Sequence, residues 1–374
     1  MPRHPTPREH APSPAGSHPL GRALHADPER ARLLALSCRV GADPALVQGP
    51  GGNTSVKLDG TLWIKASGTW LAHAGTDDIL VPVALAPLLE AFERGDPAAE
   101  KATAFVVDEA NPSGLRPSIE TTVHALVTRR IVVHVHCVET IAHAVLVDAE
   151  ASLAPRLDGL RWCWVPYARP GLPLAREIVA RHGRGCDVLV LGNHGLVIAA
   201  DTVDAAAALL AEVPARLAIV PRRPDRRAAP DRLRALAGDA GYAPPADERC
   251  HDVALDPVAL ACVDGVSLYP DHVIFLGAGT VVAQGNESVE AVLERVRARD
   301  PDAAPPPAIL VRGLGVLVRT DASAGTLALL RCLADVASRL PGRDALRVLG
   351  AGEEHELLHW EAEAYRRALA PGGP

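Results

Sequence analysis

The spacing of hydrophobic and polar residues predicts short strands and helices that alternate along most of the chain. Residues 1–27 are the exception. They are rich in Pro, His and Gly and contain no continuous apolar run, so we expect a disordered tail without a secretory signal. Residues 28–42 have helical spacing, with Asp27 as the N-cap and a proline at the first helical position. Two alternating runs then flank Asp59-Gly60, a pair typical of a β-hairpin turn.

Beyond the hairpin, β-branched apolar runs alternate with segments of helical spacing. The apolar runs predict strands at 79–83, 131–138, 160–167 and 187–200, the last with a turn at 193–195. The helical spacing predicts helices at 84–95, 117–130, 138–149, 173–183 and 202–220. Strands that alternate with helices after an initial hairpin predict an α/β fold with a mixed or antiparallel sheet.

A stretch rich in arginine and proline at 221–231 divides the chain. Its arginines would suit either a phosphate-binding patch or a solvated linker, and we favour the linker. The sequence therefore predicts one domain over 28–220 and a second, smaller α/β domain over 232–374. Within the second domain, the apolar run at 272–276 is interpreted as a strand.

Part of the second domain echoes the first. Residues 308–340 and 189–217 share the order strand, turn, strand, acidic turn and helix rich in Ala and Leu. Aligned without gaps from Asn193, the echo pairs His194 with Arg312. We therefore expect a degenerate copy that has lost this histidine, although a commonplace α/β pattern would give a similar echo.

Composition and charge exclude several classes of protein. Hydrophobic residues make up 48% of the 374 residues and charged residues 22%, as in a globular protein, and no apolar run is long enough to span a membrane. The net charge of -7 argues against a nucleic-acid-binding protein. The seven cysteines include no CxxC pair, so no disulfide framework is expected and a cytoplasmic location fits best.

Three histidines are the candidate metal ligands. His134 and His136 are two residues apart in a predicted strand, so both side chains project from the same face. At that spacing, about 6.6 Å along the strand, two imidazoles can converge on one ion. The alternative is that hydrogen bonds in the core satisfy both rings, which is harder for two rings on one face. His194, at a turn beside Gly195, is the best candidate for a third ligand.

A carboxylate and a glycine-rich loop are the other candidates for chemistry. Glu120 lies in the first turn of the helix predicted at 117–130, which Ser118 would cap. It is either the acid that completes the metal set or a residue that only stabilises the helix. The GPGGNTS loop at 49–55 matches neither a Walker loop nor a dinucleotide fingerprint, and it is either an anion cradle or a tight turn.

Six motifs, in sequence order, resemble those of the class II aldolase/adducin family over about residues 30–220: GGNTSVK, KASG, PSIETTVH, VVHVHCVETIAHA, VPYARPG and LGNHGL. The resemblance implies a three-layer α/β/α fold with a mainly antiparallel central sheet, and homo-oligomers with active sites at subunit interfaces. It also implies a divalent metal, usually Zn2+, held by three histidines. The second domain, which contains YPDHVIFLG, is similar to the region after the aldolase segment in fused aldolase/short-chain dehydrogenase proteins, although we expect no dehydrogenase here.

The residues that match the family's motifs are expected to have the roles that the resemblance implies. It implies metal ligation by His134, His136 and His194 and a catalytic base at Glu120. It implies that the phosphate or carboxylate of a small carbohydrate-like substrate binds at Asn53, Thr54, Ser67, Gly68 and Ser118.

The activity implied by the resemblance is that of a metal-dependent lyase of carbohydrate metabolism. We expect an aldolase that cleaves or forms a C–C bond in a small ketose, ketose phosphate or hydroxy-keto acid through a metal-stabilised enediolate. Epimerases of the family tend to carry Asp where this chain has Glu120, which favours C–C bond chemistry. The alternatives are a dehydratase, decarboxylase or epimerase of the same family, and a non-catalytic, adducin-like interaction protein.

The chain departs from the family pattern at two points. Ile119 stands where many members have Ser or Thr, and no residue matches the tyrosine that protonates the leaving aldehyde. Only three of the 38 basic residues are lysines, which disfavours a Schiff-base route. Lys65, beside KASG, and Lys57, beside the glycine-rich loop, are instead interpreted as substrate contacts.

Overall fold

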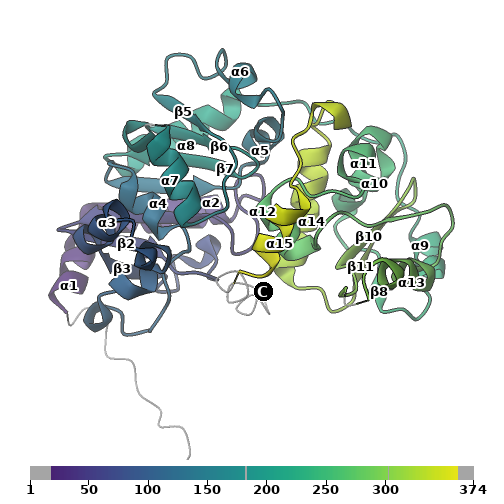
Figure 1. The fold of residues 1–374 in the computed structure, drawn as a ribbon, viewed down its shortest axis with the longest axis horizontal. Coiled ribbons are helices and arrows are strands. Elements are labelled where there is room, and N and C mark those ends of the chain that lie inside the picture. The colour runs from purple at the N-terminus through teal and green to yellow at the C-terminus, as the bar shows by residue number, and fades with distance from the viewer. Residues whose placement is uncertain (1–17, 182, 302, 361–374) are drawn as a thin grey trace, which may run out of the picture.

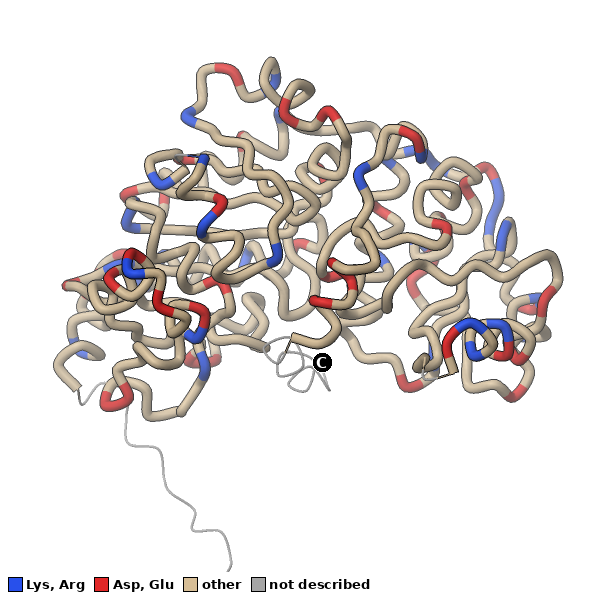
Figure 2. Tube along the Cα trace, in the orientation of Figure 1, with Lys and Arg blue, Asp and Glu red and all other residues tan. Residues whose placement is uncertain are grey.

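The computed structural model describes residues 18–181, 183–301 and 303–360 (Figure 1). Its strands form two separate sheets, a large one early in the chain and a small one later, and helices flank both. Basic and acidic residues are interspersed along the trace in both parts (Figure 2). The predicted α/β class with a second, smaller sheet is confirmed.

The large sheet has seven strands in the order β3-β2-β1-β4-β7-β6-β5. Neighbouring strands are antiparallel except for β5 and β6, which are parallel. The strands are β1 (Asn53–Leu58), β2 (Thr61–Lys65), β3 (Leu80–Ala84), β4 (Ile131–Val135), β5 (Trp162–Val165), β6 (Val188–Leu191) and β7 (Gly195–Ala200). The mainly antiparallel central sheet expected from the family is therefore present, and β4 lies at its centre.

The first hairpin of this sheet follows from its turn residues. Asp59 (φ 46°) and Gly60 (φ 76°) both adopt the left-handed conformation that a two-residue hairpin turn of type I′ requires. The turn brings Leu58 opposite Thr61 and aligns β1 with β2 in antiparallel register. The hairpin predicted from Asp59-Gly60 is confirmed.

Helices cover both faces of the large sheet, so the architecture has three layers, α/β/α. One face is covered by α2 (Pro28–Gly41) and α8 (Val203–Arg216). The other face is covered by α3 (Leu85–Glu93), α4 (Thr121–Leu126) and α7 (Leu172–Ala180). Each helix packs an apolar side on the sheet, which buries the strands from both directions.

Side chains along β4 alternate between the two faces. Ile131, Val133 and Val135 belong to the core beneath α2 and α8, whereas Val132 belongs to the core beneath α4 and α7. By this alternation, His134 points to the α4 side of the sheet. The histidine is thereby directed toward the residues that precede α4.

The small sheet repeats part of the large one. Its four strands have the order β8-β11-β10-β9, with β9 and β10 parallel and the other neighbours antiparallel. Its strands are β8 (Tyr242–Ala243), β9 (Val282–Ala283), β10 (Ala308–Val311) and β11 (Gly315–Arg319). The strands β4-β7-β6-β5 of the large sheet have the same order and the same relative directions.

The corresponding hairpins of the two sheets also share a register. β6 and β7 pair Leu191 with Gly195, and β10 and β11 pair Val311 with Gly315. A helix of 14 residues follows each hairpin, α8 in the first part and α14 (Ala324–Ala337) in the second. The echo seen in the sequence therefore corresponds to a repeated structural unit.

The register corrects one detail of the sequence alignment. With Gly195 equivalent to Gly315, the counterpart of His194 is Leu314. The ungapped alignment that paired His194 with Arg312 is wrong by two residues, because sequence similarity alone does not show where the turn begins. The second hairpin still lacks the histidine, as expected.

The run at 272–276 forms a helix, so the predicted strand is wrong. In α12 (Pro270–Leu276), Pro270 stands at the first helical position, and Gly277 (φ 90°) follows the last. Every residue of α12 is buried, so no polar face marks the helical period. Periodicity cannot distinguish such a short apolar run from a buried strand.

Other boundaries differ from the predictions at the N-terminus and around 117–130. Residues 19–26 form helix α1 (Pro19–Ala26), so the prediction of a disordered tail is wrong for them. The rest of that prediction falls on residues 1–17, which lie outside the described part. Helix α4 is shorter than predicted.

The remaining helices are α5 (Val138–Ala144), α6 (Ala149–Leu153), α9 (Pro230–Ala237), α10 (Asp252–Leu255), α11 (Pro257–Val263), α13 (Val289–Arg299) and α15 (Ala351–Leu358). Among the described helices, none combines the length and hydrophobicity needed to cross a membrane.

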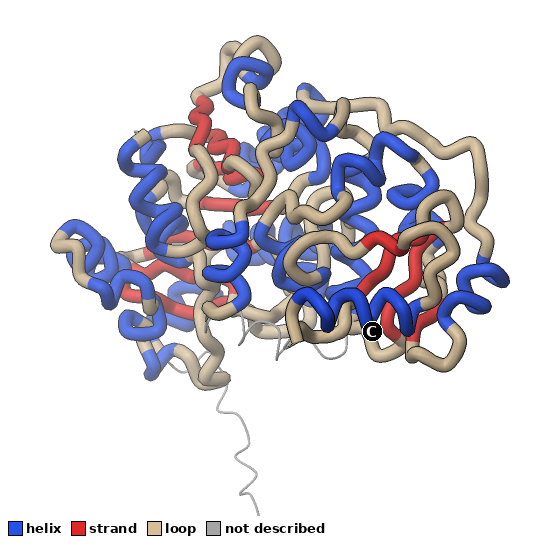
Figure 3. Tube along the Cα trace, turned by 45° about the vertical axis from the view of Figure 1, so that its right-hand side comes forward, coloured by secondary structure: helices blue, strands red, loops and turns tan. Residues whose placement is uncertain are grey.

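The two parts of the chain share a core. Helices α12, α14 and α15 lie between the two sheets (Figures 1 and 3), and their apolar residues pack together with those of α5. Arg222, in the predicted linker, contacts Asp256 at 2.7 Å and donates a hydrogen bond to the carbonyl of Ala337. This arginine is thus tied to the second part of the chain.

Candidate metal centre

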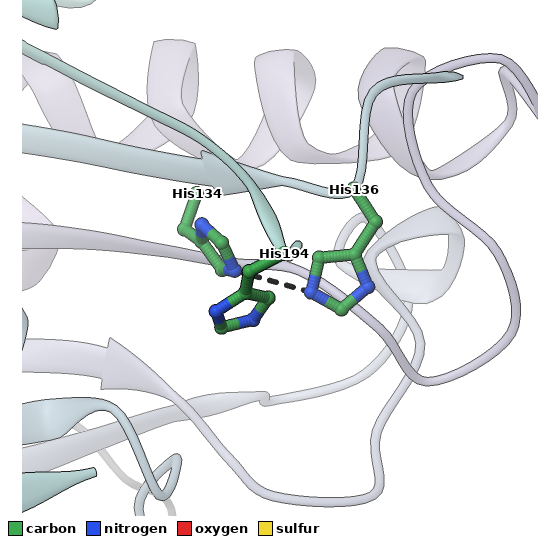
Figure 4. Close-up of side chains that lie close together, drawn as sticks. All are labelled: His134, His136 and His194. Carbon is green, nitrogen blue, oxygen red and sulfur yellow. Dashed lines mark hydrogen bonds between the residues drawn. The ribbon is translucent and has the colours of Figure 1, made fainter. Parts of the chain in front are cut away.

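Three buried histidines meet where β4 ends. His134 lies in β4, His136 follows the strand directly, and His194 lies in the turn between β6 and β7 (Figure 4). Their ring centroids are 4.9 to 5.2 Å apart, and each of the three residues is at most 5% exposed. The antiparallel pairing of β4 with β7 explains the meeting, because it brings the turn before Gly195 alongside the end of β4.

The spacing of the ring nitrogens fits a single metal ion. One nitrogen from each ring lies within 4.8 Å of the others, and the two Nε2 atoms of His134 and His136 are 3.1 Å apart. Nitrogens that bind tetrahedral zinc at about 2.0–2.1 Å would lie roughly 3.3 Å from one another. Small movements of the rings would therefore suffice for coordination.

Burial keeps two of these rings in the form that binds metals. It lowers the pKa of His134 to about 4 and that of His194 to about 3, so both are neutral at pH 7. His134 Nδ1 lies 3.1 Å from the carbonyl oxygen of Leu196. Since a carbonyl only accepts, Nδ1 must donate, which leaves the lone pair of Nε2 directed at the cluster.

Glu120 is the carboxylate at this cluster. Its Oε2 lies 3.3 Å from His134 Nε2, and its Oε1 lies 3.5 Å from His194 Nε2. Burial raises the pKa of Glu120, but the charges that His134 and His194 carry at low pH, where they are protonated, and a hydrogen bond from Asn53 outweigh it and lower the pKa to about 2. Oε1 is buried and has no hydrogen-bond partner among the described residues, as expected if a cation or substrate proton is its partner.

The backbone around Glu120 explains its position. Glu120 (φ -97°, ψ 15°) is the N-cap of α4. The prediction that Glu120 lies in the first turn of the helix is therefore wrong. Its backbone N–H donates to Ser118 Oγ at 3.3 Å, so Ser118 stabilises this turn. Asn53, opposite His134 in the sheet, donates through Nδ2 to both Ser118 Oγ (3.0 Å) and Glu120 Oε2 (2.9 Å). The carboxylate is therefore held from two directions.

A small cavity of about 20 Å³ adjoins Glu120. Most of the predicted substrate-binding residues line it, together with Lys65; the lining residues are Pro50, Gly52, Asn53, Lys65, Ser67, Gly68, Ser118, Ile119 and Glu120. Lys65 is 2% exposed and donates from Nζ to the carbonyl of Pro50 at 3.1 Å. Ile119 contributes an apolar side chain to this lining.

Two predicted contacts lie elsewhere. Thr54 Oγ1 is 2.8 Å from Ser37 Oγ on α2, which places the Thr54 side chain on the opposite face of the sheet from its neighbour Asn53. Lys57 donates from Nζ to the carbonyl of Arg129, toward the far end of β4. Strand alternation explains why the Thr54 side chain faces away from the cavity. Its position farther along β1 explains why Lys57 does not reach the cavity.

Residues that the sequence did not single out also reach the site. Asp271, on α12, has its Oδ2 2.8 Å from His136 Nδ1. A wider outer pocket shares Ser67, Ser118 and Ile119 with the small cavity and adds Arg116 and Trp360, among others. The proline at the start of α12 was a local signal for the helix, but no local signal placed Asp271 beside a histidine.

Comparison with known proteins agrees with these observations. The family model described as Class II Aldolase and Adducin N-terminal domain matches residues 32–219. A curated relative, the uncharacterized oxidoreductase YuxG of Bacillus subtilis, is 28% identical over 184 residues. That match covers 46% of this chain and 26% of the relative, so the chain spans about a quarter of the relative's length.

Two solved structures are each similar to about half of the chain. The N-terminal class II aldolase domain of a Thermoplasma acidophilum protein is 28% identical, with a TM-score of 0.45, and covers 51% of this chain and 92% of its own. L-fuculose-1-phosphate aldolase of Thermus thermophilus is 19% identical, with a TM-score of 0.33, and covers 50% of this chain and 93% of its own. Because the family model spans half of the chain, this protein belongs to the class II aldolase and adducin family.

Proposed function

We propose that this chain is a divalent-metal-dependent aldolase that cleaves or forms a C–C bond in a small ketose, ketose phosphate or hydroxy-keto acid. The observation that carries the proposal is the buried cluster of His134, His136 and His194 with the anionic Glu120 beside it. Membership of the class II aldolase and adducin family supports it. A divalent ion on the three nitrogens, with zinc as our first choice, would supply Lewis-acid polarisation of the substrate's carbonyl.

In this proposal, Glu120 moves the proton. A general base must be deprotonated, and the lowered pKa of Glu120 keeps it so at neutral pH. Asn53 holds Oε2 by a hydrogen bond, which leaves Oε1 to face a substrate. The proton would therefore be taken up at Oε1, to which none of the described residues donates a hydrogen bond.

The adjoining cavity would hold the polar end of the substrate. Lys65 brings a buried amino group to its wall, and Ser67 and Ser118 bring hydroxyl groups. A phosphate or carboxylate suits such a lining. The cavity volume of about 20 Å³ has room for one small polar group and not for a whole substrate.

Two substitutions test the proposal. His134→Ala should lose stoichiometric zinc and all activity, whereas Glu120→Gln should keep its zinc and lose about 10²–10⁴-fold in kcat. The control is His73→Ala, since His73 has an exposed side chain (39%) outside the cluster. Zinc content would be measured by mass spectrometry, and activity by aldehyde release from a panel of sugar phosphates and hydroxy-keto acids.

The outcomes separate the alternatives. Full zinc content in His134→Ala would refute the ligand assignment, and unchanged kinetics in Glu120→Gln would refute the general base. Loss of water or carbon dioxide without aldehyde release would identify a dehydratase or decarboxylase, and isomerisation at one carbon an epimerase. A protein without metal or turnover on any substrate would point to an interaction protein.

A further inference from the structure

Asp271 faces the metal centre from the second part of the chain. Its side chain is 5% exposed, and its Oδ2 lies 2.8 Å from Nδ1 of His136. The other nitrogen of that ring, Nε2, faces Nε2 of His134 at 3.1 Å. The imidazole of His136 therefore lies between the histidine cluster on one side and a buried carboxylate on the other.

The carboxylate sits on a rigid support. Helix α12 is buried along its whole length and packs in the core that also contains α14 and α5. The glycine-rich loop closes around the contact, because a Cβ on Gly51 would lie only 3.0 Å from His136 Nδ1 and 3.2 Å from Asp271 Oδ2. The loop backbone thus leaves just enough room for the two side chains to meet.

A second histidine is held by the same region. Asn193, which precedes His194, donates from Nδ2 to the carbonyls of Leu268 and Arg347, both at 2.8 Å. Asn193 has φ 50°, and its own N–H donates to Ala144. The turn that carries His194 is therefore fastened to the segment just before α12.

We infer that Asp271 is a positioning residue for His136, and that the second part of the chain thereby completes the metal centre. At 2.8 Å the two atoms are within ion-pair distance, but their alignment does not make a hydrogen bond in this structure. A small turn of either side chain would let Oδ2 accept from Nδ1, and a carboxylate that does so fixes the ring's orientation and tautomer and makes Nε2 a stronger ligand. The inference rests on the metal site of the proposed function but not on the reaction. Neither the reaction nor the substrate enters its test.

Metal affinity measures this role directly. The dissociation constant for zinc would be determined by competition with a chromogenic chelator for the wild type, Asp271→Asn and Asp271→Ala. Loss of a carboxylate behind a metal-binding histidine typically weakens affinity 10–100-fold. We expect a loss in that range for Asp271→Ala and a smaller one for Asp271→Asn, which retains an acceptor oxygen. The visible spectrum of the cobalt-substituted protein should change as His136 shifts.

The matched controls are Asp256→Asn and Asp256→Ala. Asp256 lies in the same part of the chain, is 8% exposed, and contacts Arg222 and the backbone N–H of Val258. Its variants should bind zinc within about twofold of the wild type and leave the cobalt spectrum unchanged. Circular dichroism and thermal unfolding of the metal-free proteins would show which variants fold. If Asp271→Ala does not fold, the zinc affinity of Asp271→Asn decides the test.

The possible results are distinct. Wild-type affinity and an unchanged cobalt spectrum in the folded Asp271 variants would overturn the inference, as would an equal loss of affinity in the Asp256 variants. A wild type that binds no zinc would refute the metal site of the proposed function itself. Weakened zinc binding confined to the Asp271 variants would support the inference even if no aldolase substrate were found.

Discussion

Burial decides what individual ionisable side chains can do in this protein. Burial keeps the rings of His134 and His194 neutral, whereas Glu120 stays anionic although burial opposes it, because neighbouring groups such as Asn53 outweigh the burial. Lys57 shows the same effect outside the site. Its Nζ donates to the carbonyl of Arg129 at 2.8 Å, and burial lowers its pKa from 10.5 to about 7.

Lys57 should therefore make stability depend on pH. Its pKa in the folded protein is about 7, whereas in the unfolded chain it is about 10.5, so between these values mainly the unfolded chain binds the proton. Stability from this group thus rises with pH across that window. In Lys57→Met the rise should be absent. Urea unfolding would be measured at pH 7 and pH 9.5. Between these pH values the free energy of unfolding of the wild type should rise by on the order of a few kcal/mol relative to that of the variant. If the free energies of unfolding of wild type and variant differ by the same amount at both pH values, the lowered pKa of Lys57 is contradicted.

Some residue assignments could be made from sequence and others could not. His134 and His136 were found because a strand places residues two apart on one face, which is a local rule. Thr54 was assigned to the substrate by motif, but it alternates away from Asn53 and contacts Ser37. Asp271 had no local pattern at all, because its partner lies in a distant part of the sequence.

At the level of elements, the hairpin β6–β7 sets the position of the third histidine. Its turn passes close to β4, and a Cβ on Gly195 would overlap the carbonyl oxygen of Val135. A glycine is thus required where β7 begins beside the end of β4. The element could be predicted from its apolar run, whereas the reason for its glycine appears only in the packed sheet.

Gly195→Ala should push β7 away from β4. We expect a loss of about 1–3 kcal/mol in the free energy of unfolding, from overpacking against the main chain. The zinc affinity should fall as well, because His194 moves with the strand. Gly185→Ala is the control, since a Cβ at Gly185 meets no atom within 4 Å and the residue has no left-handed φ. Equal unfolding midpoints in urea for the two variants would count against this reading of the hairpin.

Element type was predictable where the pattern was periodic and failed where it was not. The amphipathic α2 and the hairpin around Asp59-Gly60 have clear signals, and both were predicted. Helix α12 was predicted as a strand because it is short and buried on all sides. The error matters, since α12 is the element that carries Asp271.

On the scale of the whole molecule, the chain repeats four of the seven strands of its large sheet and uses the second copy differently. The order β8-β11-β10-β9 matches β4-β7-β6-β5, but Leu314 stands where the first copy has His194. The helices of the second part pack on α5, directly after His136. The second part thus lacks the third histidine and instead supports the centre in the first, while the expected homo-oligomer stays a prediction.

Metal binding should stabilise the whole chain. A ligand that binds only the folded state at 100 times its Kd adds about 2.7 kcal/mol. We expect zinc to raise the thermal unfolding midpoint by a few degrees and excess chelator to reverse the rise. In His194→Ala the rise should be much smaller. The same zinc-dependent rise in His194→Ala and in the wild type, followed by calorimetry, would mean that the ion binds elsewhere.

The sequence by itself determined the local features of this protein: the alternation of strands and helices, the hairpin turn, the shared face of His134 and His136, and the family. These depend on residues within a few positions of one another, which periodicity and motifs record. Tertiary structure alone decided that Glu120, Asn53 and His194 meet at the end of β4, and that Asp271 lies behind His136. Sheet register and helix packing bring distant segments together, and no local pattern encodes those distances.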